Sequence, residues 1–269
     1  MIVKEALREA TARLATKLEN PRREASLLLS AWLQKEMIWL VMHDDTQIED
    51  LAGYFDWVDR RIADEPYEYI VGKASFYSRE FIVHPGVLIP RPETELLVDK
   101  ALGLIEGITA PRIAEIGVGS GIVSTMIALL RPDSQIIASD ISVAALDNAR
   151  ANITKFNVQE QIALVNTSLL EGILGTFDLL VSNPPYIAKA ELLEAHVLKE
   201  PHSALFGGDN GDELLAQIIL TCKQRHIPRL ACEMGYDQKK SMQTLLKEAK
   251  ESSFYQDLAG HDRGFTALF

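Results

Sequence analysis

The sequence predicts an α/β protein in which a doubly wound sheet domain follows a small all-helical bundle. Three observations lead to this prediction. Apolar residues recur every three or four positions over the first 73 residues, which is typical of amphipathic helices. From Arg112 to the C-terminus, β-rich runs alternate with helical stretches. The length of 269 residues, with 47% hydrophobic and 24% charged residues, fits one large core and one smaller unit.

The first predicted domain, residues 1–73, is a bundle of short helices. The apolar stripe of its first helix comprises Val3, Leu7, Ala10, Leu14 and Leu18. A second stripe follows Pro21, and a further helix is expected to open at Thr46, because Thr46 and Glu49 match the T-x-x-E pattern of a capping box. The aromatic residues expected to pack in the bundle core are Trp32, Trp39, Phe55 and Trp57.

Residues 74–90 form the predicted connection between the two domains. The run ASFYSREFIVHPGVLIP is rich in aromatic and β-branched residues and is interrupted by Pro and Gly, which is typical of a β-hairpin. Pro90 and Pro92 then end the extended chain, and a helix is expected to start at Pro92 or Thr94. The second domain is therefore expected to span residues 91–269.

The strands of this second domain are predicted at RIAEI, QIIAS, IALVNTS, FDLLVSN and RLACEM, with two more strand-like runs near the C-terminus. Helices are expected between them, beginning after the glycines that follow RIAEI, at Ser142 and near Asp212. Doubly wound sheets bind their ligands beyond the carboxyl ends of the strands. Two motifs follow directly on predicted strands, so we expect them to meet at one edge of the sheet.

The composition argues against several functional classes. Twenty-seven Lys and Arg against 38 Asp and Glu give a net charge of −11, which opposes attraction to nucleic acid or to an anionic membrane surface. The uncharged stretch 116–130 is too short to span a membrane, and the N-terminus lacks the apolar region of a secretory signal, so a cytoplasmic protein is expected. Cys222, Cys232 and the histidines show no metal-ligand spacing, and we expect no metal site.

A glycine-rich loop follows the first predicted strand of the sheet. Its residues include Glu115, Gly117, Val118, Gly119, Ser120 and Gly121. The G-x-G-x-G spacing differs from that of NAD sites and of P-loops, which disfavours phosphate binding. Asp140 closes the next strand, where a carboxylate accepts both ribose hydroxyls of an adenosine. Because Glu115 favours a cationic group, S-adenosylmethionine, with its ammonium and sulfonium, fits better than NAD.

The second motif, Asn183-Pro184-Pro185-Tyr186, follows the predicted strand FDLLVS. Two consecutive prolines fix the backbone and remove two N–H donors, which leaves carbonyl acceptors. The side-chain oxygen of Asn183 and the carbonyl of Pro184 can together accept both hydrogens of a planar NH2 group, on which the Tyr186 ring can stack. We therefore expect these four residues to form the catalytic pocket for an amide or exocyclic amine nitrogen that accepts the methyl group.

These motifs resemble those of class I methyltransferases that modify planar nitrogens, and within them the peptide chain release factor glutamine methyltransferases of the HemK/PrmC type. The resemblance covers nearly the whole chain. Its most specific part is the I-P-R-P-E-T-E run at residues 89–95, which precedes the predicted sheet domain. Besides the glycine-rich loop and NPPY, the other matching segments are residues 65–66, 69–70, 72, 85–88, 200–201, 204–205 and 207–209.

The resemblance implies that a seven-stranded, Rossmann-like methyltransferase domain follows the helical bundle and the hairpin linker. It also makes the helical bundle a candidate for substrate recognition. It implies transfer of a methyl group from S-adenosylmethionine to the side-chain amide nitrogen (N5) of the glutamine in the GGQ motif of class I peptide chain release factors. By position, the loop 117–121, Asp140 and Asn183 contact the cofactor, Ser168 lies beside the adenine, and residues 183–186 hold the glutamine. We expect a monomer that binds neither nucleic acid nor membrane.

Two alternatives stay open at this point. A DNA or RNA adenine N6-methyltransferase needs the same acceptor pocket around a flipped base, but no basic target-recognition region is visible in the sequence. A protein that only binds adenosine and uses its bundle to dock a partner is the other alternative, and the intact NPPY motif argues against it. Arg91 and Glu93 are expected to fix the linker onto the sheet domain rather than to contact substrate.

Overall fold

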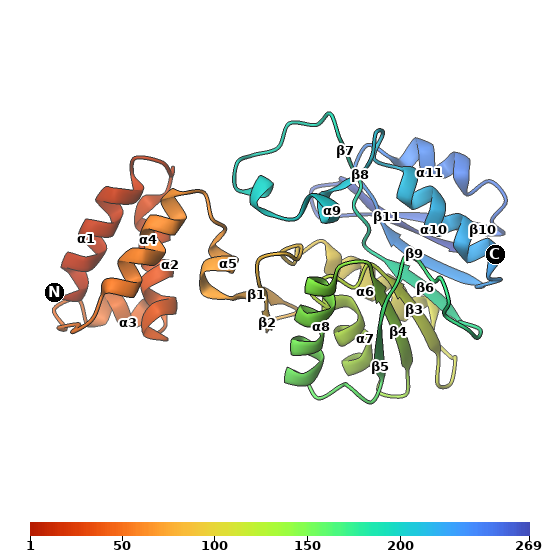
Figure 1. Ribbon diagram of the computed structural model, residues 1–269, viewed down its shortest axis with the longest axis horizontal. Coiled ribbons are helices and arrows are strands. Elements are labelled where there is room, and N and C mark those ends of the chain that lie inside the picture. Colours follow the sequence, from red (N-terminus) through yellow and green to blue (C-terminus); the bar gives the residue numbers. More distant parts are fainter. The chain divides into compact units, whose positions relative to one another are not determined.

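The computed structural model describes residues 1–269, which form two compact units (Figure 1). The first unit consists of Met1–Lys73 together with Leu193–Lys199, and the second consists of Ala74–Leu192 and Glu200–Phe269. None of the helices has both the length and the apolar character that crossing a membrane requires.

The first unit is built from helices. They are α1 (Val3–Leu14), α2 (Pro21–Leu33), α3 (Met37–Met42), α4 (Ala52–Ile62), α5 (Tyr67–Val71) and the short 3-10 helix η1 (Val197–Lys199). The predicted stripes of α1 and α2 form its buried core together with Tyr54 and Val58 of α4. The Tyr54 hydroxyl donates to the Ala25 carbonyl at 3.1 Å, which satisfies the polar end of this buried ring.

The helix predicted to open at Thr46 begins instead at Ala52, so this boundary was wrong. The segment around Thr46 is used for pairing with the N-terminus, since Gln47 forms an antiparallel bridge with Ile2. At the actual helix start, the Asp50 carboxylate accepts the Ala52 N–H at 2.9 Å and so satisfies one otherwise unpaired donor. The pairing of Gln47 with Ile2 thus outweighs the preference of Thr46 and Glu49 for starting a helix.

The second unit contains a seven-stranded sheet in the order β10-β11-β9-β6-β3-β4-β5. Its strands are β3 (Arg112–Ile116), β4 (Gln135–Asp140), β5 (Ile162–Asn166), β6 (Leu179–Ser182), β9 (Arg229–Glu233), β10 (Glu251–Gln256) and β11 (Asp262–Leu268). Five neighbouring strands, β9, β6, β3, β4 and β5, are parallel to one another. Strand β11 pairs antiparallel with β9, and β10 pairs antiparallel with β11. This confirms the predicted seven-stranded α/β fold and brings the carboxyl ends of five strands to one edge.

Helices cover both faces of this sheet (Figure 1). On one face lie α6 (Thr94–Leu104), α7 (Ile122–Leu130) and α8 (Val143–Lys155), and on the other lie α10 (Glu213–Gln224) and α11 (Lys239–Leu245). Side chains of a strand alternate between the two resulting cores: Leu179 and Val181 of β6 pack in the first, and Leu180 packs in the second. Cys222 and Cys232 are free, buried thiols of the second core.

A β-hairpin connects α5 to the sheet domain. Its strands are β1 (Lys73–Phe76) and β2 (Arg79–Ile82). Tyr77 and Ser78 at its tip both have positive φ, 49° and 54°, as the two central residues of a type I′ turn require. Phe76 and Phe81 pack in the first core of the sheet, so the hairpin is fixed to the second unit.

Two buried asparagines of α8 tie this hairpin to the glycine-rich loop. Asn152 accepts the Ile82 N–H at 2.7 Å and donates to the carbonyls of Ile82 and Ser120, both at 2.8 Å. Asn148 accepts the His84 N–H at 2.8 Å and donates to the Ile82 carbonyl at 2.9 Å. The position of the glycine loop therefore depends on the residues that precede the sheet.

We expect Asn152→Ala to lower the free energy of unfolding by about 1–3 kcal/mol, because it removes a fully buried amide and leaves the half-buried Ile82 N–H and the Ser120 carbonyl without this partner. Urea unfolding followed by circular dichroism measures this change. Thr154→Ala, at an exposed position of the same helix, is the matched control and should change stability far less. Equal effects of the two substitutions would contradict a role for Asn152 in holding the hairpin.

Candidate active site

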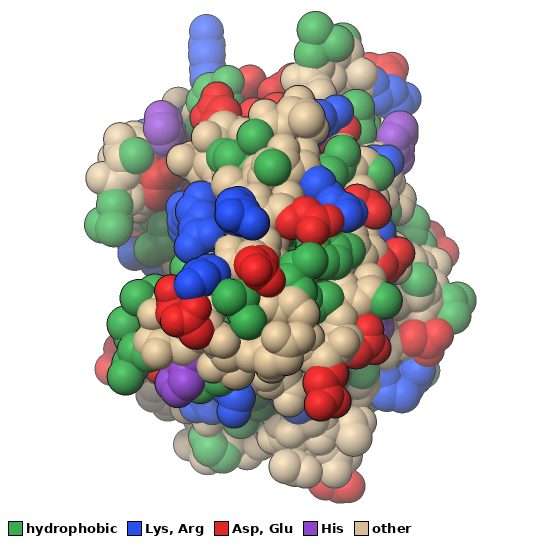
Figure 2. Space-filling view, turned by 90° about the vertical axis from the view of Figure 1, so that its left-hand side faces the viewer, with side chains coloured by type: hydrophobic (Ala, Val, Ile, Leu, Met, Phe, Trp, Pro, Cys, Tyr) green, Lys and Arg blue, Asp and Glu red, His purple; other side chains and the backbone are tan.

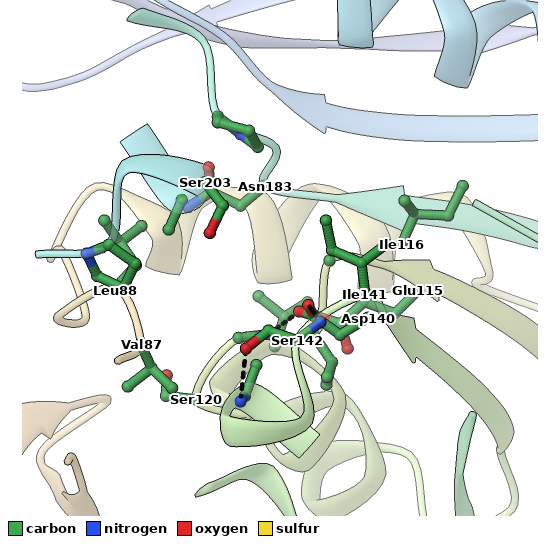
Figure 3. A pocket seen from close by; sticks show the side chains of 18 of the residues that line it. Val87, Leu88, Glu115, Ile116, Ser120, Asp140, Ile141, Ser142, Asn183 and Ser203 are labelled. Carbon is green, nitrogen blue, oxygen red and sulfur yellow. Dashed lines mark hydrogen bonds between the residues drawn. The ribbon is translucent and has the colours of Figure 1, made fainter. Parts of the chain in front are cut away.

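A pocket lies at the carboxyl edge of the parallel strands (Figure 3). The predicted site residues that line it are Glu115, Gly117, Val118, Gly119, Ser120, Asp140, Ser168, Asn183 and Pro185. The predicted residues Gly121, Pro184 and Tyr186 are not part of its lining. In Figure 3, Asn183 and Ser203 lie on one side of the pocket, and Asp140 and Ser142 lie on the opposite side. The two sequence motifs thus face one common space.

The glycine-rich loop turns sharply between β3 and α7. Gly119 has φ of 52°, in the left-handed region that favours glycine, and its N–H donates to the Asp140 carboxylate at 3.0 Å. Gly121 begins α7 with φ of 80°, and a Cβ there would lie 3.0 Å from Cα of Ala149 in α8. Gly121 therefore serves close helix packing behind the pocket, while Gly119 shapes the loop that lines it.

Asp140 ends β4 and is half-buried. One carboxylate oxygen accepts the Gly119 N–H at 3.0 Å, and the other accepts the Ser142 N–H at 2.8 Å. An ionised carboxylate offers about four acceptor positions, so both oxygens retain capacity for hydroxyl donors from a ligand. Asp140 thus offers acceptors, already oriented by the backbone, to hydroxyl donors in the pocket.

Glu115 lies beneath the loop and is only 2% exposed. Its carboxylate accepts the N–H of Ser124 at 3.1 Å and also the Ser124 hydroxyl. Burial raises the pKa of Glu115 to about 8, and the nearby Asp140 charge adds to this effect. The carboxyl is therefore largely protonated at neutral pH, and a cationic ligand group beside it would favour the ionised form. The pairing of Glu115 with such a group stays a prediction.

Asn183 directly follows β6 and has one buried polar atom without a partner. Its Nδ2 donates to the Thr94 hydroxyl oxygen at 3.1 Å. Its Oδ1 is buried and accepts no hydrogen bond. Leaving such an acceptor unpaired costs roughly 1–3 kcal/mol, so natural proteins rarely tolerate it without a reason. An acceptor at the lining of a pocket is complementary to an N–H donor of a ligand.

The NPPY turn is held in place by contacts that the sequence did not reveal. The buried Gln238, beyond β9, donates to the Tyr186 carbonyl at 2.9 Å and accepts the Gly235 N–H at 2.9 Å. Gly207 and Gly211 pack so closely that a Cβ on either would lie 2.4 Å from the carbonyl oxygen of Pro185 or Tyr186, respectively. Side chains at these two positions would therefore displace the turn.

After this turn the chain forms a second small sheet. Strand β7 (Ile187–Ala188) pairs in parallel with β8 (Phe206–Gly208), which follows the short helix α9 (His202–Leu205). Ser203 and Ala204 of α9 line the pocket. The segment that leads away from NPPY therefore returns to the same site.

Thr94 and Glu233 join Asn183 and Tyr186 in one buried network, and neither was predicted as a site residue. The Thr94 hydroxyl donates to Glu233 at 2.8 Å, and the Tyr186 hydroxyl donates to the other oxygen of the same carboxylate at 3.4 Å. Burial raises the pKa of Glu233 to about 7, and burial also raises the pKa of Tyr186. The sequence feature that could have indicated Glu233 as a site residue is its position, because, like Asp140, it is the last residue of an apolar parallel strand.

Of the predicted residues that remain, Ser168 and Arg91 line the pocket and Glu93 does not. Ser168 is exposed in the turn after β5 and lines the pocket. Arg91 forms an ion pair with Glu200, which is 3% exposed and also accepts the Ile89 N–H at 2.9 Å. These contacts join the 86–91 segment to the start of α9, in agreement with the structural role expected for Arg91. Glu93 pairs with Arg263 of β11 at 3.6 Å.

This fold is that of a class I methyltransferase. Residues 93–208 match the methyltransferase small domain family, and residues 5–72 match the PrmC N-terminal domain family. The release factor glutamine methyltransferase of Bordetella pertussis is 36% identical over 90% of this chain and 93% of its own length. The protein of the same name from Moorella thermoacetica is 34% identical over 99% of this chain and 98% of its own length. The chain belongs to the release factor glutamine methyltransferase family.

Solved structures support the fold. The catalytic domain of hMettl16 in complex with the MAT2A 3′UTR hairpin 6 superimposes with a TM-score of 0.58 and covers 70% of this chain and 74% of its own. Its sequence identity to this chain is 15%, so the similarity concerns the methyltransferase fold and not the RNA substrate.

Proposed function

We propose that this protein methylates N5 of the glutamine in the GGQ motif of class I peptide chain release factors, with S-adenosylmethionine as the methyl donor. The observation that carries the proposal is the buried, unpaired Asn183 Oδ1 at the lining of the pocket. A glutamine side chain offers a planar NH2 group with two N–H donors, which complements this acceptor. Relatives of this family that span almost the whole chain carry the matching name.

The catalytic task is to aim a weak nucleophile. The lone pair of an amide nitrogen is delocalised, and the NPPY turn offers no obvious base. We infer that Asn183 Oδ1 accepts an amide hydrogen and that Pro185 confines the amide plane, since both residues line the pocket. The Pro184 carbonyl and the Tyr186 ring do not line it, and a direct contact of either with the amide requires the turn to shift when the substrate binds. Such positioning supplies up to about 7–11 kcal/mol in favourable cases. As the N–C bond forms, the bond between the methyl carbon and the sulfonium sulfur breaks and S-adenosylhomocysteine is the leaving group. Positive charge on the nitrogen strengthens the hydrogen bond to Asn183 Oδ1 until one amide proton is lost to water.

The residues on the other side of the pocket fit the methyl donor. When bound, S-adenosylmethionine supplies an electrophilic methyl group on a sulfonium. Asp140 would accept the ribose hydroxyls, the 117–121 loop would allow close backbone approach, and Ser168 would lie beside the adenine. Glu115 would balance the positive charge of the methionine part.

The domain roles follow from the same substrate. Residues 1–73 would contribute to recognising the release factor, residues 74–90 would link them to the catalytic domain, and residues 91–269 would perform the transfer. We infer that the enzyme acts as a monomer in the cytoplasm, where release factors function in translation.

The adenine N6-methyltransferase alternative is not favoured. The curated relatives that span this chain act, by their names, on release factor glutamine. On the face shown in Figure 2, acidic side chains lie among the basic ones, and the net charge of −11 works against the phosphate contacts that nucleic acid binding needs. Membership of a methyltransferase family likewise speaks against a purely adenosine-binding adaptor.

Mass spectrometry of a release factor incubated with the protein and S-adenosylmethionine tests this proposal. We expect one added methyl group on the glutamine of the GGQ motif, and none on a release factor in which that glutamine is replaced by alanine. Duplex DNA in a parallel reaction serves as the competing substrate. A methyl group on another residue, or on DNA alone, would overturn the assignment.

A further inference from the structure

We propose that Glu233 is a positioning residue for methyl transfer: through Thr94 it fixes which face of the Asn183 amide points into the pocket, and it also holds the Tyr186 hydroxyl. The proposal rests on the function proposed above. It assigns to the end of β9 a role in orienting both ends of the NPPY turn, although Glu233 itself does not line the pocket.

The geometry forms a continuous chain of hydrogen bonds. Asn183 Nδ2 lies 3.1 Å from Thr94 Oγ1, which lies 2.8 Å from one oxygen of Glu233. The second oxygen of Glu233 lies 3.4 Å from the Tyr186 hydroxyl. Glu233 is 2% exposed and Thr94 is 1% exposed, so water does not readily replace these partners. One buried carboxylate therefore connects the first and the last residue of the motif.

The donor and acceptor roles in this series of hydrogen bonds determine which atom of the Asn183 amide faces the pocket. An ionised carboxylate only accepts hydrogen bonds, so Thr94 must give its single proton to Glu233. The Thr94 oxygen then faces Asn183 as an acceptor, which selects the NH2 end of the Asn183 amide. Oδ1 of Asn183 is consequently left to face the substrate as an acceptor, as an incoming NH2 group requires.

A neutral group at position 233 removes this selection. A protonated carboxyl can donate to Thr94, whose proton is then free to turn toward Asn183. The Asn183 amide could then rotate and present its NH2 end to the pocket, where it would oppose the NH2 group of the substrate. The same change weakens the hold on Tyr186, because only one oxygen of the carboxyl still acts as a full acceptor.

The surroundings of Glu233 place this change near neutral pH. Burial raises its pKa to about 7, and the Glu93 charge adds to the increase, while Arg263 opposes it. Tyr186, Tyr255 and Cys232, the other titratable neighbours, have pKa values raised by burial and stay neutral in this range. Since the pKa is raised, the active ionised form is lost as the pH falls through about 7.

Glu233→Gln tests the proposal, because it keeps the shape but supplies one acceptor and one donor. We expect kcat toward a release factor at pH 8 to fall about 10- to 100-fold, the worth of one hydrogen bond to a charged group. At saturating S-adenosylmethionine, wild-type kcat should drop about tenfold from pH 8 to pH 6, as the ionised fraction of Glu233 falls, and this dependence should disappear in Glu233→Gln. Glu251→Gln, at an exposed end of β10, is the control and should retain both properties.

A double-mutant comparison separates positioning from general stabilisation. In an Asn183→Ala background, Glu233→Gln should lower kcat less than threefold further, because the larger part of its effect passes through Asn183 and only the long 3.4 Å contact with the Tyr186 hydroxyl remains. Thr94→Val, which keeps the side-chain shape and removes the hydroxyl, should reproduce the kcat loss. Independent, multiplicative losses, or a Glu233→Gln enzyme with wild-type kcat and pH profile, would overturn the proposal. Absence of methylated glutamine with the wild-type protein would instead refute the proposed function.

Discussion

Asn183→Ala is expected to lower kcat for release factor methylation on the order of 10²- to 10³-fold, the range measured when one oriented catalytic hydrogen-bonding group is removed. The substitution deletes the buried acceptor Oδ1 and also the Nδ2 contact to Thr94. Without the acceptor, the glutamine NH2 group can rotate, and its lone pair is no longer aimed at the methyl carbon. Single-turnover measurements with saturating cofactor report this step directly.

Two further measurements make the Asn183 prediction specific. Affinity for S-adenosylhomocysteine, measured by titration calorimetry, should change only a few-fold, because Asn183 lies on the side of the pocket opposite Asp140 (Figure 3). Asn157→Gly is the control, since Asn157 is exposed with φ of 57°, a conformation that glycine adopts readily. Near-normal kcat in Asn183→Ala with cofactor still bound would show that the amide is oriented by other groups.

The parts of the site that follow directly on strands were predictable from sequence. Parallel strands bring their carboxyl ends to one edge, so the chain neighbours of β3, β4 and β6 had to meet there once the strands were recognised. Asp140 and Asn183 were found in this way, and both line the pocket. The same rule, applied to β9, would also have indicated Glu233, which was read only as part of a strand.

The contacts that orient the NPPY turn were not predictable, because they join residues distant in the chain. Thr94 meets Asn183 across 89 positions, and Gln238 meets the Tyr186 carbonyl across 52. No local pattern encodes such pairings. The helix boundary predicted at Thr46 failed for the same reason, since pairing with the N-terminus competes there with a capping preference worth only about 1 kcal/mol.

Replacing Asp140 is expected to act on cofactor affinity rather than on chemistry. In Asp140→Ala, the ribose hydroxyls lose a charged acceptor, and the N–H groups of Gly119 and Ser142 lose the group that orients them. Two hydrogen bonds to a charged group contribute about 3 kcal/mol or more together, so the Kd for S-adenosylhomocysteine should rise on the order of 100-fold. At saturating cofactor, kcat should change far less than in Asn183→Ala.

The amide variant sharpens the Asp140 prediction, because each carboxylate oxygen already accepts one backbone N–H. In Asp140→Asn, whichever way the amide is placed, its NH2 group must face the N–H of Gly119 or of Ser142, and two donors then oppose each other. We therefore expect Asp140→Asn to bind the cofactor almost as weakly as Asp140→Ala, despite its similar size. Asp147→Asn is the matched control, since its exposed ion pair with Arg150 contributes little to stability or binding. Wild-type affinity in Asp140→Asn would mean that the carboxylate does not hold the ribose.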